Sequence, residues 1–589
     1  MDNGRKSRDI EFSSGKINQL LSDGYEMEAV LRDLLSFTKP SCQSFIVSFL
    51  QRYSKEQIEF YLPQLVHLSL VFPNYSAYSN LFHELAVDDH NLGVKIFWLI
   101  GTYLEHPTLL GINKDIVKLE SYIINGKSVH SQGEVISLYK INNLEDDIYF
   151  RKLIRQEYFD VQRKFIEAVI KISIDLCEKD ELMNSFLSNS LLDLDNTLTK
   201  LRKKYANPTY NNYTARLYRG IVLPLDFSDY NEQIVRILPL ESYCIRTSSR
   251  VPYLLMIETI DLNEPSREQS INNSIIIKHP STENILKHQS KKMKRYSTQN
   301  IRTYWTESWE DKLERLRRAS PFRKYESFQI RGLIIKSNDD LRQEHLGMQV
   351  IKKALEIFKK ESLTLTLRPY NIVITGYRSG FIEFIPNTQS IHNLKKTYES
   401  YDTLLDIYKL IWGPNFDEAQ INFVQSMAGY SLICYILNLK DRHNGNILID
   451  SKGHVIHIDF GFFLTSSPGG NFGFESAPFK LTIEMIELMG GYQGEMYVYF
   501  CMLVSKGFLA LRKYFDDFCL LFEIMEIKSD FECFVDKENA VREFKQRFLM
   551  ELENEECLDK VMGLIVDAAD NWRTNQYDLF QKGANSIKS

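Results

Sequence analysis

Three polar side chains late in the chain limit what its last domain can be. Asp441 and Asn446 lie five positions apart, and Asp459 follows thirteen positions later, at the head of an Asp-Phe-Gly sequence. Phosphoryl transfer needs a carboxylate beside the acceptor hydroxyl, oxygen ligands for divalent cations, and cations on the phosphates. Asp441 fits the first role, and Asn446 and Asp459 fit the second, because magnesium prefers oxygen ligands. One Asp-Phe-Gly alone is usually an ordinary turn, but the whole set in this order predicts a kinase.

The length and composition predict a multidomain protein of ordinary globular type. At 589 residues the chain is too long for one core, and roughly three or four domains are expected. A net charge of −6 creates no field that would attract nucleic acid. Eight cysteines without a C-x-x-C pair indicate free thiols, and residues 1–15 hold no apolar signal core. We therefore expect a cytoplasmic protein that binds no nucleic acid and can visit a membrane surface.

The first half of the chain has the pattern of paired helices. Ser54 and Gln57 form a candidate capping box before an amphipathic stretch. Similar stretches cover residues 27–53, 78–104 and 149–205. We predict a flexible N-terminus at 1–25 and an α-helical, solenoid-like domain at 26–205. A generic helical domain is the alternative, and this region by itself indicates no activity.

Near Arg216 the pattern changes to strands. Residues 243–260 and 330–336 are rich in Ile, Leu, Val and Tyr, as strands are. We predict a kinase N-lobe over 206–386, built on an antiparallel sheet, with a flexible insertion at about 263–304. The insertion carries a basic cluster between Lys287 and Arg295, either a solvated loop or a site for anionic lipid head groups.

A helix is expected from Asn338, as its N-cap, to about Phe358. Glu344 falls on the apolar stripe of this helix, where a carboxylate needs a partner. The nearest candidate is Lys336 at the end of the preceding strand, because kinases hold a phosphate-binding lysine with a helix carboxylate. A solvent-exposed lysine is the alternative.

Residues 387–589 are expected to be mostly helical and to form the C-lobe. Phe423–Leu439 is apolar on nearly all faces, so it is the predicted central helix and leads directly to Asp441. The strand before this lobe ends in Glu383, Phe384 and Ile385, whose backbone groups are predicted to bind adenine. The expected fold is α+β: a two-lobed kinase catalytic domain, with an antiparallel-sheet N-lobe and a mostly helical C-lobe, preceded by an α-helical solenoid-like domain.

Several motifs together resemble one family. Lys336–Glu344, Asp441–Asn446 and His457–Gly461 resemble the phosphatidylinositol 3-/4-kinase superfamily. Further segments resemble the type III phosphatidylinositol 4-kinase beta branch of this superfamily. They are Arg246–Tyr253, Phe423–Ser426, Asp459–Leu464, Ser466–Pro468, Phe474–Glu475, Phe479–Thr482 and Met489–Gly491. The resemblance covers roughly Arg216–Lys582 and, more faintly, Phe60–Leu65. It implies a helical domain of the lipid kinase unique type, and phosphorylation of phosphatidylinositol at the inositol 4-hydroxyl with ATP and Mg²⁺, or alternatively Mn²⁺.

The resemblance also implies roles for individual residues. Lys336 would contact the ATP phosphates, and Ser320, Pro321 and Phe322 would form the loop that covers them. This loop departs from the family, since Arg323-Lys324 stands where a glycine is common. The remaining nucleotide-site residues are Glu344, Tyr370, Leu448 and Ile458, the last three lining the adenine pocket.

The catalytic loop leaves one alternative open. Asp441 would be the general base or would position the hydroxyl, with Arg442 and His443 supporting the loop. His443 could instead touch the transferring phosphate, or be a structural histidine.

The segment 462–480 indicates the substrate. It holds one basic residue, Lys480, and one acid, Glu475, so it suits phosphatidylinositol without further ring phosphates. Phe462 replaces the histidine seen in many 3-kinases and favours a 4-kinase. Phe462, Phe463, Phe472 and Phe474 either enter the lipid interface or pack against the lobe. Residues 572–587 could form a membrane-associating helix.

Two other functions remain as alternatives: a serine/threonine protein kinase of the phosphatidylinositol-kinase-related type, and a non-catalytic scaffold. The resemblance further implies peripheral binding to Golgi membranes, a role in phosphoinositide signalling and membrane trafficking, and a Rab-class small GTPase and a calcium-sensor protein as partners.

Overall fold

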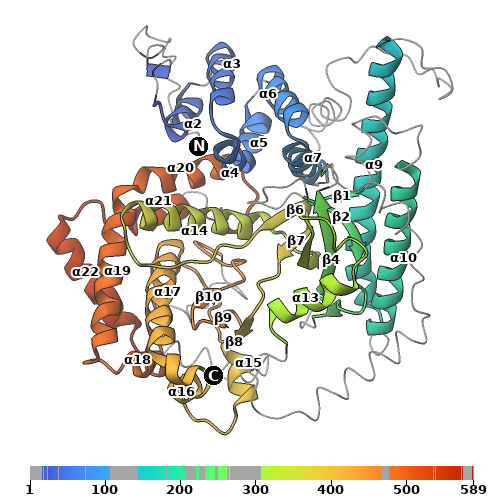
Figure 1. The fold of residues 1–589 in the computed structure, drawn as a ribbon. Helices are drawn as coiled ribbons and strands as arrows, with labels where there is room; N and C mark the ends of the chain where they lie inside the picture. Colours follow the sequence, from blue (N-terminus) through green and yellow to red (C-terminus); the bar gives the residue numbers. More distant parts are fainter. Residues whose placement is uncertain are drawn as a thin grey trace. The chain divides into compact units, whose positions relative to one another are not determined.

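In the computed structural model the chain divides into two compact units. Figure 1 labels the helices and strands of the chain. The sheet unit comprises 1–341 and 371–384, and the helical unit comprises 342–370 and 385–589. The described residues are 16, 19–20, 22, 24–37, 39–72, 75–105, 144–179, 183–205, 220–223, 232–245, 250–261, 264, 307–466, 477–534, 536, 539–571, 574 and 587.

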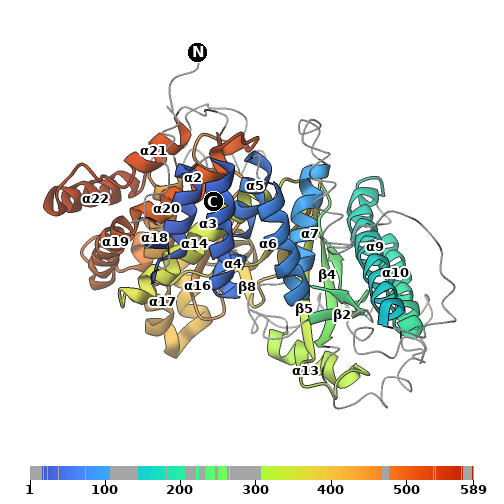
Figure 2. The same cartoon turned by 90° about the horizontal axis from the view of Figure 1, so that it is seen from above.

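The first part of the sheet unit is helical, as its amphipathic pattern predicts. Its helices are α2 (Met27–Ser36), α3 (Pro40–Phe49), α4 (Lys55–Phe60), α5 (Leu62–Val71), α6 (Tyr75–Asp88), α7 (His90–Leu104), α9 (Leu144–Leu176) and α10 (Met183–Tyr205). The predicted capping box opens α4: the Gln57 N–H donates to Ser54 Oγ (3.3 Å), and the Ser54 N–H donates to Gln57 Oε1 (3.1 Å). Helices α5, α6 and α7 lie side by side (Figure 2).

An antiparallel sheet forms the rest of this unit. Its strands are β1 (Ile221–Val222), β2 (Glu232–Ile237), β3 (Tyr243–Cys244), β4 (Tyr253–Asp261), β5 (Gln329–Ser337), β6 (Ile372–Gly376) and β7 (Ser379–Glu383). The order is β1-β2-β4-β5-β7-β6, with β3 paired to β4. Eight of the nine residues of β4 are buried, because helices or loops cover both of its faces.

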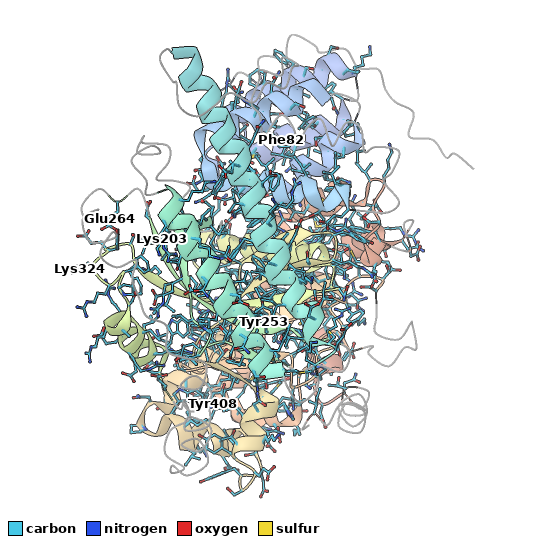
Figure 3. The ribbon with its side chains drawn as sticks, turned by 90° about the vertical axis from the view of Figure 1, so that its right-hand side faces the viewer. Phe82, Lys203, Tyr253, Glu264, Lys324 and Tyr408 are labelled. Carbon is cyan, nitrogen blue, oxygen red and sulfur yellow. The ribbon has the colours of Figure 1, made fainter. Side chains whose placement is uncertain are left out.

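The two faces of β4 pack against different elements. Tyr253 lies under α9, where its hydroxyl donates to the Val169 carbonyl (2.9 Å; Figure 3). Leu254 and Met256 belong to a cluster on the opposite face that includes Leu316 of α13 (Trp309–Ala319). Phe322, Tyr325 and Phe328, which follow α13, complete this cluster. The segment after α13 is therefore held by the core of the sheet.

The helical unit is built around α17 (Phe416–Leu437), whose residues are nearly all buried from Phe423 onward. The helix ends at Asn438, which has a φ of 48°, and the Leu439 N–H then donates to the Cys434 carbonyl (2.9 Å). The other elements are α14 (Arg342–Lys360), β8 (Thr388–Ser390), α15 (Ile391–Thr397), α16 (Leu404–Trp412), β9 (Ile447–Asp450), β10 (Val455–His457), α18 (Ile483–Leu488), α19 (Glu495–Lys513), α20 (Phe515–Glu526), α21 (Ala540–Gln546) and α22 (Asn554–Ala568). Strands β10, β9 and β8 pair in that order as a small antiparallel sheet beside α17.

The predicted α+β class is confirmed, with an antiparallel sheet in one unit and mostly helices in the other. The predicted helix start was wrong by several residues, because α14 begins at Arg342. Asn338 has a left-handed φ of 55°, and the Asp339 N–H donates to the Arg378 carbonyl (3.1 Å). This bond ties the chain to the sheet before the helix can start.

Several predictions lie outside the described residues. They are the insertion at 263–304 apart from Glu264, the basic cluster within it, Phe472, Phe474, Glu475, most of 1–25 and nearly all of 572–589. The proposed domain boundaries stay predictions. Among the described residues, none of the helices combines the length and the apolar character that crossing a bilayer requires.

Close packing of α19 against α17 yields a stability prediction. A Cβ added at Gly507 would come within 2.5 Å of the Leu365 and Leu432 side chains. Gly507→Ala should therefore lower the free energy of unfolding by about 1–3 kcal/mol, measured by urea denaturation of the full chain. Gly563→Ala in α22, where a Cβ meets nothing within 4 Å, is the control. It should stabilise by up to about 1 kcal/mol through helix propensity. Equal stability of the two variants would contradict this packing.

Candidate active site

Asp441 lies directly after α17, in the loop that joins this helix to β9. Its backbone has a left-handed φ of 60°, which is uncommon for a residue other than glycine. The Asn446 Nδ2 donates to the Asp441 carbonyl (3.0 Å) and lies 3.4 Å from its Oδ2. The Lys440 N–H donates to the Phe462 carbonyl (2.9 Å), so the loop is tied to the segment that follows Asp459. These hydrogen bonds stabilise the unfavourable backbone conformation of Asp441 and so fix the position of its carboxylate.

Arg442 connects the loop to the Asp-Phe-Gly segment. Its guanidinium donates to the carbonyls of Lys440 (2.9 Å), Ile458 (2.7 Å) and Asp459. It is buried, and it lies 5.7 Å from the centre of the Phe460 ring. Arg442 therefore bonds to the backbone around the candidate site, and its role in supporting the loop stays a prediction.

The hydrogen bond at Nδ1 of His443 defines the tautomer of its neutral ring. The Gly445 N–H donates to His443 Nδ1 (3.0 Å), so the hydrogen of a neutral ring sits on Nε2, which is 3.7 Å from Asp441 Oδ1. Burial lowers the pKa of His443, and the nearby charges of Arg442 and Lys480 lower it further, while Asp441 opposes them. The Nε2–H of the neutral His443 ring thus lies near the Asp441 carboxylate, at a distance longer than a hydrogen bond.

Asn446 and Asp459 have the donor atoms that a divalent cation needs. The Nδ2 of Asn446 is committed to Asp441, which leaves Oδ1 as its possible metal-binding atom. Asp459 has a φ of 62°, and the Gly461 N–H lies 3.3 Å from its Oδ1. Within the described residues no three His, Cys, Asp or Glu side chains gather as metal ligands. Magnesium held beside a nucleotide uses one or two carboxylates plus phosphate oxygens, so this smaller donor set fits it.

Gln343, in the first turn of α14, fixes the chain just after Asp459. Its Nε2 donates to the Gly461 carbonyl (2.6 Å) and to Ser466 Oγ (3.3 Å), and its Oε1 accepts from the Cys533 N–H (3.0 Å). Gln343 belongs to the Lys336–Glu344 motif, but the motif alone does not predict a hydrogen bond from Gln343 to the Gly461 carbonyl. Its only signal there was a position beside Glu344 at the start of a helix.

Glu344 and Tyr370 form a buried pair in the helical unit. The Tyr370 hydroxyl donates to Glu344 Oε1 (2.6 Å). Burial raises the pKa of Tyr370, and the charges of Glu344 and Asp459 raise it further. Of the other predicted adenine-pocket residues, Leu448 lies on β9, and the Ile458 N–H donates to the Asn446 carbonyl (3.1 Å). Tyr370 and Ile458 thus lie near Asp459, and their predicted place in an adenine pocket stays a prediction.

Lys336 occupies the end of β5 in the sheet unit. Its ammonium lies 3.4 Å from Asp339 Oδ2, and Arg250 lies 2.5 Å from the other oxygen of that carboxylate. The predicted partnership with Glu344 joins residues of different units and stays a prediction.

The loop predicted to cover the phosphates and the first two residues of the predicted hinge, Glu383 and Phe384, belong to the sheet unit. Ser320 and Phe322 are buried. At the hinge, the Glu383 N–H donates to the Asn371 carbonyl, and the Phe384 N–H donates to the Gly332 carbonyl (both 2.9 Å). The Glu383 carboxylate accepts from Asn371. In the helical unit, the Ile385 carbonyl accepts from Thr388 Oγ1 (2.8 Å). The N–H groups of Glu383 and Phe384 and the Ile385 carbonyl already have partners within the protein. A hydrogen bond to adenine at this segment would therefore need other backbone groups.

The described part of the substrate segment is mostly inside the protein. Phe463 is fully buried against Phe522, with ring centres 6.4 Å apart, whereas Phe462 is half-buried. Lys480 is also buried. Phe463 therefore packs against the lobe, which was one of the two alternatives for these aromatic residues.

These features define the class of the domain. A carboxylate held in a strained loop, an amide and a carboxylate suited to a divalent cation, and a lysine on an antiparallel sheet are the parts of a kinase-type phosphotransferase.

Comparison with known proteins shows which family part of the chain resembles. Residues 330–529 match the model of the phosphatidylinositol 3- and 4-kinase family. This part of the chain is therefore similar to a phosphatidylinositol 3- and 4-kinase domain.

Curated relatives match over 48% of the chain. It is 45% identical to a phosphatidylinositol 4-kinase of Dictyostelium discoideum over 285 residues, covering 24% of that protein. It is 45% identical to phosphatidylinositol 4-kinase beta 1 of Arabidopsis thaliana over 288 residues (26% of that protein). It is 42% identical to phosphatidylinositol 4-kinase beta of Xenopus tropicalis over 285 residues (35%). The chain thus spans about a quarter to a third of the length of these relatives.

Gln343→Met should impair the reaction more than the fold. The variant keeps the volume of the side chain but leaves the Gly461 carbonyl and the Cys533 N–H without this partner, so Asp459 loses its nearby anchor. We expect the turnover number to fall by about ten- to a hundredfold and the magnesium concentration for half-maximal rate to rise. Both are measured by titrating the metal at saturating ATP.

The control is Gln162→Met in α9, a buried glutamine that donates to the Val222 carbonyl (2.8 Å). It should lower the melting temperature and leave the magnesium dependence unchanged. A Gln343→Met variant with normal magnesium dependence would contradict the anchoring role.

Proposed function

We propose that this chain transfers the γ-phosphate of ATP to the 4-hydroxyl of the inositol ring of phosphatidylinositol, giving phosphatidylinositol 4-phosphate. The observation that carries the proposal is the arrangement of Asp441, Asn446 and Asp459 around one loop, inside a region matched by the phosphatidylinositol 3- and 4-kinase model. The relatives named as 4-kinases support the choice of hydroxyl.

Each residue of the loop has a distinct part in the proposed reaction. Asp441 accepts the proton of the attacking hydroxyl, because the nitrogen of His443 that faces it carries a hydrogen and cannot act as a base. His443 donates from Nε2 and holds the carboxylate or a phosphate oxygen. Arg442 keeps the loop and the Asp-Phe-Gly backbone in register. Lys336 binds the ATP phosphates.

Magnesium is the proposed divalent cation, with manganese as the alternative. Asn446 Oδ1 and the Asp459 carboxylate would hold it, and the bound ion would neutralise charge on the phosphates. Asp459 must then keep its left-handed backbone, since that conformation directs its carboxylate. Arg442 and Gln343 hold the peptides on either side of this residue.

Plain phosphatidylinositol is the proposed acceptor lipid. Across 462–480 the sequence has one basic residue, Lys480, and this lysine is buried beside the catalytic loop. A head group with additional phosphates needs several accessible cations, which this segment lacks in its sequence. The enzyme would work as a peripheral protein at a membrane surface. Golgi membranes, a Rab-class GTPase and a calcium sensor are further proposals, supported by the sequence resemblance alone.

A direct assay tests the activity. The full chain is incubated with radiolabelled ATP, magnesium and vesicles of phosphatidylinositol, and the product is resolved by chromatography that separates the ring isomers. We expect labelled phosphatidylinositol 4-phosphate, and no label in a serine- and threonine-containing peptide substrate. Label in the peptide but not in the lipid would favour a protein kinase, and label in neither would favour a scaffold.

Asp459→Ala should lower turnover of phosphatidylinositol by more than about a hundredfold, because one of two protein ligands for the cation is lost. Lys336→Ala should have a similar effect at saturating lipid through loss of a phosphate contact. The control is Asp417→Ala, an exposed carboxylate in the first turn of α17, which should keep full activity. Near-normal turnover by a folded Asp459→Ala variant would show that the metal assignment is wrong.

A further inference from the structure

The loop predicted to cover the ATP phosphates is anchored from inside the sheet unit. Ser320 ends α13, and its hydroxyl donates to Glu258 Oε2 on β4 (2.7 Å). The same oxygen of Ser320 accepts from the Phe322 N–H (3.0 Å), which turns the chain back over the sheet. Ser320 is 3% exposed and Glu258 is 1% exposed, so water does not compete for this hydrogen bond.

A second anchor comes from helix α10. Arg202 places its guanidinium 5.4 Å from the centre of the Phe322 ring, within the range of a cation–π contact. Arg202 is itself held by the Val235 carbonyl and by Thr199 Oγ1 (3.1 Å). Phe322 is buried among Val235, Met256 and Ile330, so its ring packs in the core behind the loop.

Lys336 lies on the same face of the sheet as this loop. Side chains alternate along a strand, and Ile330 and Ile334 of β5 both pack on the cluster that contains Phe322. Lys336 follows in the same alternation. Glu258 stands opposite Ile330 in the register of β4 and β5. The lysine and the loop therefore share one surface, and Glu258 lies beneath it.

Burying a carboxylate in the core costs free energy unless ion pairs and hydrogen bonds compensate for the lost hydration. Burial raises the pKa of Glu258, while Arg236, 3.3 Å from Oε1, and the Ser320 hydroxyl oppose this rise. The neighbours that face Glu258 are thus Arg236 and Ser320, with Asp195 and Arg202 close enough to act electrostatically. A leucine would fill the same space without desolvating a charge.

We propose that Glu258 and Arg202 are positioning residues for the nucleotide: they fix residues 320–324 so that the loop can hold the ATP phosphates. This inference rests on the proposed use of ATP, but not on the identity of the acceptor. With Ser320 and Phe322 used as anchors, the phosphates are held by the backbone of the loop and by its exposed residues Arg323 and Lys324. Arg323 then supplies a cation where related loops have a glycine.

Nucleotide binding by the full chain tests the proposal without any lipid. The dissociation constant of a non-hydrolysable ATP analogue with magnesium is measured by calorimetry. Glu258→Leu should raise it about tenfold, and Glu258→Gln, which keeps an oxygen to accept from Ser320, should stay within about threefold of the unsubstituted chain. The turnover number of Glu258→Leu at saturating ATP should change by less than about threefold.

A double substitution separates positioning from direct contact. Ser320→Ala combined with Glu258→Leu should bind the analogue no more weakly than either single variant, because both remove one and the same hydrogen bond. Effects that multiply would overturn the proposal, since Ser320 would then act on the nucleotide independently of Glu258.

Ser327→Ala is the matched control. Ser327 is a buried serine seven positions later, and its hydroxyl donates to the carboxylate of Glu264 (2.7 Å). It should affect stability without changing nucleotide affinity. A folded Glu258→Leu variant with unchanged affinity would refute the inference.

If Glu258→Leu does not fold, Arg202→Met decides the question. Methionine keeps contact with the Phe322 ring but loses the charge, and the affinity for the analogue should fall several-fold. Unchanged affinity in that variant would refute the inference. An unsubstituted chain that binds the analogue but labels no lipid would contradict the proposed acceptor only, so the two failures are distinguishable.

Discussion

The guanidinium of Arg442 holds together the backbone on which the candidate active site depends. It donates to the carbonyls of Lys440, Ile458 and Asp459, and so joins the loop after α17 to the segment after β10 that carries the proposed metal ligand Asp459. Both Asp441 and Asp459 have left-handed backbone angles, with φ of 60° and 62°. Such conformations are unfavourable by roughly 1 kcal/mol or more for residues with a Cβ, and they persist only where the surroundings fix them. Buried hydrogen bonds from one planar side chain provide that constraint.

The start of α14 supplies a second layer of support. Three consecutive buried residues each hold a different segment: Arg342 donates to Asp530, Gln343 to the Gly461 carbonyl, and Glu344 accepts from Tyr370. A helix turn can present neighbouring side chains in three directions, so one short stretch of sequence fixes parts of the chain far from it. This arrangement explains why the first turn of the helix is almost entirely buried although it is polar.

In the sheet unit, too, buried side chains hold distant segments of the chain in place. Strand β4 is buried on both faces, with Tyr253 bonded to α9 and Met256 packed under the segment after α13. Glu258 interrupts that apolar face and bonds to Ser320. The helices on one face and the loop on the other are thus connected through a single strand, and Arg202 of α10 reaches the loop directly. Rigid placement of a loop requires such contacts, because its own backbone forms few regular hydrogen bonds.

The fold class, the central buried helix and the capping box at Ser54 could all be predicted from the sequence alone. The set of residue types in the candidate catalytic loop could be recognised there as well. These follow from local periodicity and from spacing over a few tens of residues, which do not depend on the rest of the chain. It misplaced the start of α14, because the bond between Asp339 and Arg378 comes from a distant hairpin. Four features are visible only in the folded chain: Gln343 bonds to the Gly461 carbonyl, Phe463 is buried, Nε2 of His443 carries the hydrogen, and Glu258 accepts from Ser320. Each of these features depends on contacts between residues that folding brings together, and no local pattern in the sequence predicts such contacts.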